Sequence, residues 1–195
     1  AYVDMASATG FPELYTGDNP ETTPNVVQQF SALHKTFSGF SGSFGGTYNV
    51  SDSFLLKANV SRGFRAPSIA ELSANGPDPG SQIYHVGNSS FKPEFSVQED
   101  VGLFLTLPSL SASVELFNND LKNYIFQEQL LNPDGTPSRV NPDGTPNNAG
   151  LYERFTYVQS KARINGGELN VDIHPLPWLH FENSLSLTYG QNLGN

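Results

Sequence analysis

Residues 179–189 read LHFENSLSLTY and alternate apolar with polar side chains from end to end. The odd-numbered face has five apolar residues in six positions, and the even-numbered face, His180 to Thr188, has none in five. Successive side chains of a β-strand point to opposite sides of the sheet, so this segment is predicted to form a strand with one apolar and one polar face. A membrane barrel and a soluble sandwich can both use such a strand.

Five further stretches show the same period of two, and short links join the six stretches into three hairpins. The links lie at 49–52, 107–110 and 175–178. The apolar faces of the other five stretches are Phe40, Phe44 and Tyr48; Phe54, Leu56, Ala58 and Val60; Val97, Val101, Leu103 and Leu105; Ala112, Val114 and Leu116; and Leu169, Val171 and Ile173.

The connections between the hairpins are much longer than the links within them. They run roughly over 63–95 and 118–163 and are rich in Pro, Gly, Asn and Asp. Long loops of this kind are uncommon in compact soluble domains, whereas outer-membrane barrels join strands by short periplasmic turns and long outside loops. The pattern therefore predicts an all-β fold, the wall of an antiparallel transmembrane β-barrel, located in the bacterial outer membrane with outer-membrane lipid against its apolar face.

Length and charge narrow the interpretation further. Six strands are fewer than the roughly 8 strands of the smallest outer-membrane barrels, and unpaired backbone groups in lipid cost several kcal/mol each. We therefore expect residues 1–195 to be part of a longer barrel. The formal net charge of −9 argues against a nucleic-acid partner. Acidic outer loops would also repel an anionic cargo unless the few Arg and Lys side chains gather in the lumen.

The sequence NPDGTP occurs twice, at 132–137 and 141–146. Asp followed by Gly beside Pro is typical of tight turns, because Pro fixes one dihedral angle and Gly accepts positive φ. Two consecutive turns at a loop tip are the favoured interpretation. Calcium held by Asp134 and Asp143 is the alternative, but the ligand spacing of a calcium loop is missing.

The chain shows no arrangement typical of an enzyme. It has no Gly-x-Ser-x-Gly nucleophile elbow and no Gly-rich phosphate loop opening a helix, so we expect neither catalysis nor a cofactor. His174 and His180 flank a short link with no third ligand apparent at metal spacing, which favours a structural or solvent role and no metal site. His85, beside Tyr84 in an outside loop, is the one histidine predicted to contact a metal chelate, and Tyr84 is a second candidate for ligand contact.

Two short sequence motifs resemble those of a known protein family. Residues 61–72 read SRGFRAPSIAEL, and residues 91–95 read FKPEF. In this order they resemble two motifs of TonB-dependent outer-membrane receptors, with Phe91 where that family has leucine. The matching residues are Arg62, Gly63, Phe64, Arg65, Ala66, Pro67, Glu71, Leu72, Lys92, Pro93 and Glu94.

The resemblance implies an energised importer of siderophores, cobalamin or similar scarce nutrients. It implies a barrel of about 22 strands with a plugged lumen, of which residues 1–195 would supply about six strands. The plug domain, the C-terminal strands and the segment that engages the TonB-type energising protein would lie outside this chain. A passive porin or adhesin barrel is the first alternative, and a soluble β-sandwich binding module is the second.

Physical roles can be assigned to several of the matching residues. Pro67 cannot donate to a strand ladder and suits the end of a strand, and Gly63 is expected to allow close approach of another backbone. The charged members, Arg62, Arg65, Glu71, Lys92 and Glu94, are expected at the outer ends of neighbouring strands. They either pair across the inner wall and hold the loop against the plug, or remain solvated loop charges.

Overall fold

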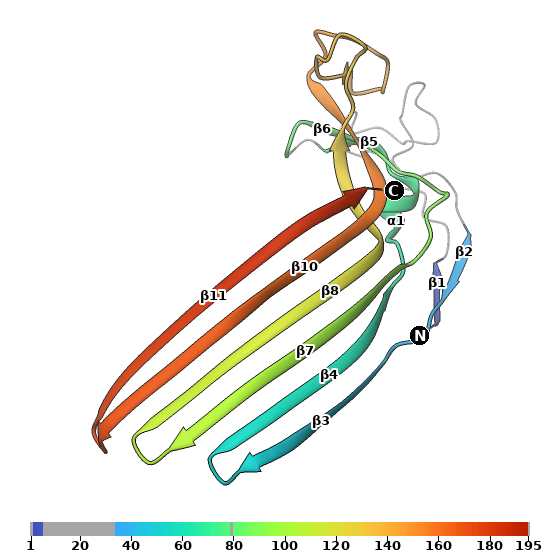
Figure 1. Cartoon of the computed structure of the whole chain (residues 1–195). Helices are drawn as coiled ribbons and strands as arrows, with labels where there is room; N and C mark the ends of the chain where they lie inside the picture. The colour runs from blue at the N-terminus through green and yellow to red at the C-terminus, as the bar shows by residue number, and fades with distance from the viewer. Residues whose placement is uncertain (1, 6–33, 79, 195) are drawn as a thin grey trace.

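Six long antiparallel strands form a single-layered sheet in this computed structural model, which describes residues 2–5, 34–78 and 80–194 (Figure 1). They pair in the order β3-β4-β7-β8-β10, and β11 pairs with the far side of β10. Their bounds are β3 Gly42–Ser51, β4 Phe54–Arg65, β7 Glu94–Leu107, β8 Leu110–Gln129, β10 Tyr152–Leu176 and β11 Leu179–Gly194.

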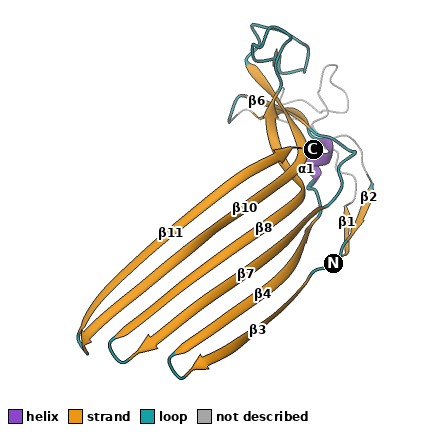
Figure 2. Ribbon diagram, viewed as in Figure 1, coloured by secondary structure: helices purple, strands orange, loops and turns teal. Residues whose placement is uncertain are grey.

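The remaining elements are short. Helix α1 spans Ile69–Ser73, and it is not long or apolar enough to cross a bilayer, nor is any other helix among the described residues. The short strands are β1 Tyr2–Met5, β2 Lys35–Ser38, β5 Asn75–Asp78, β6 Ile83–Val86 and β9 Arg139–Val140. Figure 2 shows that α1 and β6 lie at the end of the sheet opposite the three short hairpin turns.

The strand register confirms the two predicted faces. One row of register partners crosses all six strands through Tyr48, Leu56, Leu103, Val114, Leu169 and Leu185. The neighbouring row contains Thr47, Lys57, Gly102, Glu115, Glu168 and Ser186. Apolar side chains of the first row remain exposed, including Tyr48, Leu103 and Leu185, because no second layer covers this face among the described residues. A soluble sandwich would pack this face against another sheet.

The described strands extend beyond the length that the apolar pattern predicts. β8 continues to Gln129 and β10 begins at Tyr152, so the predicted outside connection 118–163 is wrong in extent and the true connection is 130–151. Directly above the apolar band, outward positions of both strands are polar, as at Asn118, Asp120 and Arg163. The alternation therefore stops while the hydrogen-bonded ladder continues.

A β-bulge marks the upper part of β8. The register between β8 and β10 shifts between Ser160 and Ala162, opposite Asn123, which has a φ of 58°. Asn tolerates this left-handed conformation better than most residues, and a bulge bends the strand that contains it. The Asn123 side chain also donates to the carbonyl oxygen of Pro93 at 2.9 Å. The bulge thus ties the upper β8 to the start of β7.

Above the bulge, short strands replace β11 as neighbours of β10. The pairing of β10 with β11 ends at Lys161, and β6 lies parallel to β10 over Glu153 to Thr156. β5 pairs with β6, and β9 pairs with the beginning of β10. This cluster of short strands forms the outer end of the wall and holds the two long connections in place.

Candidate functional site

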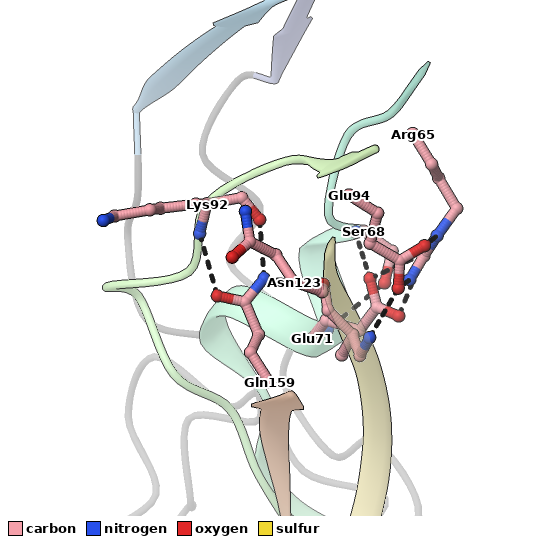
Figure 3. A network of polar contacts seen from close by, with 8 residues as sticks. Arg65, Ser68, Glu71, Lys92, Glu94, Asn123 and Gln159 are labelled. Carbon is pink, nitrogen blue, oxygen red and sulfur yellow. Dashed lines mark hydrogen bonds and ion pairs between the residues drawn. The ribbon is translucent and has the colours of Figure 1, made fainter. Parts of the chain in front are cut away.

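Arg65 joins three elements at the outer end of the sheet. Its guanidinium forms a two-point ion pair with Glu94, with Nη2 at 2.6 Å from Oε1, and it also lies 3.0 Å from both carboxylate oxygens of Glu71 (Figure 3). Glu94 is buried and also accepts from the backbone N–H of Ile125 on β8. One carboxylate therefore connects the end of β4, the start of β7 and the upper part of β8. We call Arg65, Glu71 and Glu94 the charge knot.

Local chemistry fixes the position of Glu71 in this knot. Ser68 begins α1 with a capping box, in which its hydroxyl accepts from the Glu71 N–H and the Glu71 carboxylate accepts from the Ser68 N–H. Such reciprocal caps satisfy two backbone donors at a helix start. Hydrogen bonding and charge from Glu94, then from Glu71, raise the pKa of Arg65 above its ordinary value, although burial opposes this shift. The guanidinium stays charged at any physiological pH.

The other two predicted charges do not join the knot. Lys92 is held by its backbone, which donates to Oε1 of Gln159 at 3.2 Å and accepts from Nε2 at 2.6 Å, while its ammonium points away (Figure 3). Arg62 donates to the Phe40 carbonyl oxygen at 2.6 Å and lies over the Phe95 ring. Of the five charged residues in the matching motifs, Arg65, Glu71 and Glu94 pair with one another, whereas Arg62 and Lys92 stay outside this network.

The apolar residues of the two matching motifs form a small core next to the charge knot. Leu72 and Phe91 are buried with Phe37 and Ile125, and Phe64, Ala66 and Tyr157 pack against them. Pro67 is fully buried just beyond the end of β4, as its missing N–H predicts. The two motifs thus build an apolar cluster that is joined to the charge knot through Ile125, whose N–H donates to Glu94.

The role expected for Gly63 needs correction. A Cβ atom at Gly63 would lie 2.4 Å from the Ser96 hydroxyl oxygen, its register partner on β7. The close neighbour is therefore a side chain and not another backbone. Since Ser96 is small and has a rotatable side chain, the constraint at Gly63 is weaker than the expected one.

The two residues predicted to contact a ligand lie in different surroundings. Tyr84 is buried with Val140 and Tyr152 and approaches Asn75 Oδ1 at 3.1 Å, so its ring belongs to a core and not to an exposed binding surface. His85 is half-buried, stacks on Tyr157 at 6.2 Å between ring centroids and lies 3.1 Å from Gln127 Nε2. Burial lowers the pKa of His85, which favours the neutral imidazole. Since Gln127 Nε2 can only donate, Nδ1 of that imidazole accepts, and the Nε2–H is left to donate.

The repeated NPDGTP segments are two nearly identical turns, as predicted. In the first, Thr136 donates to Asp134 Oδ1 from both its N–H and its hydroxyl, and in the second Thr145 does the same to Asp143. The glycine of each turn has a φ of 82°. Both carboxylates are used by their own turn, which agrees with the turn interpretation and not with a calcium loop.

The inner face of the sheet is acidic. Glu115 lies directly opposite Glu168 across β8 and β10, and Asp172 lies directly opposite Glu182 across β10 and β11. Lys57 shares the row of Glu115. The arginines Arg62, Arg65 and Arg139 instead lie at the outer end, so positive side chains are not gathered on the described part of the inner face.

Comparisons with known proteins agree with this arrangement. Residues 13–195 match the family model described as TonB dependent receptor-like, beta-barrel. An iron-regulated outer membrane virulence protein of Vibrio cholerae is 37% identical over 94 residues, covering 45% of this chain and 14% of that protein. A probable TonB-dependent siderophore receptor, PirA of Acinetobacter baumannii, is 30% identical over 125 residues, covering 57% of this chain and 17% of that protein.

A solved structure shows the same fold. The siderophore receptor PirA from Pseudomonas aeruginosa superposes with a TM-score of 0.56 at 21% sequence identity, over 80% of this chain and 25% of that one. The chain thus spans 14 to 17% of the length of the curated relatives. With its apolar outward face and acidic inward face, it is part of an outer-membrane wall. This chain belongs to the TonB-dependent receptor-like β-barrel family.

Proposed function

We propose that this chain is part of the wall of a receptor that captures a ferric siderophore outside the cell and imports it with energy from a TonB-type protein. The observation that supports the proposal best is the family match over 13–195, joined by relatives whose names specify iron regulation and siderophores. Transport of this kind breaks no covalent bond. The family is one of transporters and receptors, and we propose that the chain has no enzymatic activity.

We assign a separate role in import to each of three parts of the wall. The apolar band anchors the barrel in outer-membrane lipid, and the acidic inner face borders a hydrated path or a plug. The charge knot fixes the loop that follows β4 over the barrel mouth, where it could hold that loop against the plug. We place the plug domain, the coupling segment and the remaining strands of the barrel in parts of the receptor outside this chain.

Uptake of iron-labelled siderophores by a strain that lacks the receptor gene tests this function. Expression of the intact receptor should restore uptake of at least one siderophore class, and removal of the TonB-type protein should abolish that uptake again. A passive porin would restore uptake without the energising protein. Restoration that does not depend on it would therefore contradict the proposal.

His85 is the proposed contact with the metal chelate on the outer side. Its neutral imidazole and its place beside Tyr157 suit contact with a metal chelate, through donation from its Nε2–H to an oxygen of the chelate or through ring stacking. His85→Ala should weaken cargo binding to cells by about threefold to tenfold, the loss of roughly one hydrogen bond. His180→Ala, at the other end of the wall, is the matched control, and equal affinities of the two variants would remove His85 from the site.

A further inference from the structure

Three metal-ligating side chains meet beside the turn between β10 and β11. Asp172 and His174 come from β10 and His180 comes from β11, and one ligand atom of each lies within 4.8 Å of the others. A single carboxylate oxygen, Oδ2 of Asp172, lies 3.2 Å from Nδ1 of His174 and 3.2 Å from Nδ1 of His180. The third ligand that the spacing of the histidines did not reveal is therefore Asp172.

Strand geometry explains why these three side chains converge. Asp172 and His174 are two residues apart on β10, so their side chains point to the same face of the sheet. That face is the inner one, because Asp172 shares it with Glu168 and Glu182. The tight turn after Leu176 returns the chain, and the two imidazole rings stack with centroids 5.4 Å apart. Two paired strands thus hold the three ligands at the periplasmic end of the wall.

Water-borne ions can reach this cluster. The side-chain exposures are 22% for His174, 30% for Asp172 and 48% for His180, so none of the ligands is sealed from solvent. Glu182, the register partner of Asp172, adds a further negative charge to the neighbourhood. A divalent cation would relieve the repulsion between these two facing carboxylates, since like charges directly opposite each other destabilise a strand pair.

We propose that Asp172, His174 and His180 bind a divalent first-row transition ion, Zn²⁺ or Cu²⁺, at the periplasmic end of the wall. Two imidazoles and one carboxylate suit these ions, whereas Mg²⁺ and Ca²⁺ prefer oxygen ligands alone. Three protein ligands leave a coordination position open to water. The ion would also join β10 to β11 across their turn and stabilise that hairpin.

This proposal goes beyond import, because the site lies at the end of the wall opposite the loops that would capture cargo (Figure 1). A receptor could import a siderophore with this site empty, and the site could bind zinc in a receptor with another cargo. Failure of the uptake experiment and failure of the binding experiment are therefore separate results.

Copper resonance on the intact receptor gives the first test. The receptor is purified in detergent without a histidine tag, stripped with a chelator and loaded with one equivalent of Cu²⁺. The electron paramagnetic resonance spectrum should show coupling to two imidazole nitrogens, and His180→Gln should reduce this coupling to one nitrogen. A wild-type spectrum without nitrogen coupling would overturn the proposal, whatever any variant does.

Zinc titration gives the second test and uses a matched control. The wild type should bind one more equivalent of Zn²⁺ than the His174→Gln, His180→Gln double variant, while His34→Gln, at a histidine outside the cluster, should bind as the wild type does. Asp172→Asn, which keeps the side-chain shape, should weaken zinc binding at least tenfold. Equal stoichiometry and affinity in the wild type and a double variant that still forms heat-resistant barrels would contradict the site.

Discussion

The lower and upper halves of β8 and β10 form one continuous ladder but meet different solvents. In the lower halves, outward residues such as Val114 and Leu169 are apolar and exposed. In the upper halves, the outward positions Asn118, Asp120 and Arg163 are polar, and β8 pairs with β10 as far as Gln129. Antiparallel pairing of β8 with β10 continues through both halves apart from the bulge at Asn123, while the outward side chains change from apolar to polar at the upper end of the apolar band.

This difference separates two properties that the hydrophobic pattern combines. Alternation with a period of two reports a strand only where one of its faces is oily, and in this wall the oily face is the one that lipid covers. Directly above the apolar band the outward face is polar, as at Asn118, Asp120 and Arg163, so the strand continues without its sequence signal. The upper end of the apolar pattern therefore marks the boundary of the membrane and not the end of the strand.

Placing a charge on the lipid face should have the largest effect. Leu185→Arg puts a guanidinium on the apolar row of β11, where a charge costs roughly 2 to 4 kcal/mol near the midplane of the bilayer. We expect a marked loss of heat-resistant, membrane-inserted barrel, measured by gel mobility of unboiled samples and by the yield in outer-membrane fractions.

Two controls separate the face from the height in the membrane. Ser184→Arg places the same group one residue away on the inner face, and Asn118→Arg places it on the outward face of β8 above the apolar band. Both variants should assemble far better than Leu185→Arg. Equal assembly of Leu185→Arg and Ser184→Arg would contradict the faces, and failure of Asn118→Arg would contradict the position of the upper boundary.

The charge knot should make the largest polar contribution of the upper half. Glu94→Ala removes a buried carboxylate that holds Arg65 and the Ile125 N–H, and we expect a loss of about 1 to 2 kcal/mol of unfolding free energy, discounted for the partial exposure of Arg65. Denaturant unfolding of the receptor in lipid vesicles measures it.

A double-mutant cycle identifies the source of this loss. Arg65→Ala, Glu94→Ala and the double variant should give a coupling of at least about 0.5 kcal/mol, as expected for residues in one network. Lys92→Ala is the control, because the Lys92 ammonium points away from the knot (Figure 3). Additive effects of Arg65 and Glu94 would show that the two charges act as solvated groups.

The membrane-spanning part of the fold could be predicted from the sequence for a physical reason. Lipid forces strict apolar alternation, so the six strands and their three turns could be read from residues such as those of 179–189. The upper strands could not, because Asn118 and Asp120 face water and satisfy no period. The short strands β5, β6 and β9 depend on pairing with distant parts of β10, which no local pattern encodes.

The candidate sites were predictable to different degrees. The motifs around Arg65 and Glu94 indicated a charge cluster. Which charges pair depends on the position of α1 and on the register of β4 against β7. The sequence places Tyr84 in an outside loop, whereas in the fold Tyr84 is buried against Val140 of β9 and Tyr152 of β10. The signal for Asp172 was present, since Asp172 and His174 share a strand face two residues apart and His180 follows a tight turn.

The smallest effect is expected at an ion pair that resembles the charge knot in chemistry but not in setting. Arg163 pairs with Asp120 at 2.7 Å across the outward face of β8 and β10, and the Arg163 hydrogen bond lowers the pKa of Asp120. Both side chains are more than 40% exposed, and among the described residues Asp120 bonds only to side chains of β8 and β10. Solvent and salt screen such a pair, so Arg163→Ala should leave the unfolding midpoint unchanged within error. A shift as large as that of Glu94→Ala in the same unfolding experiment would mean that exposed strand pairs hold the upper half together, and that burial of Glu94 is not what distinguishes the knot.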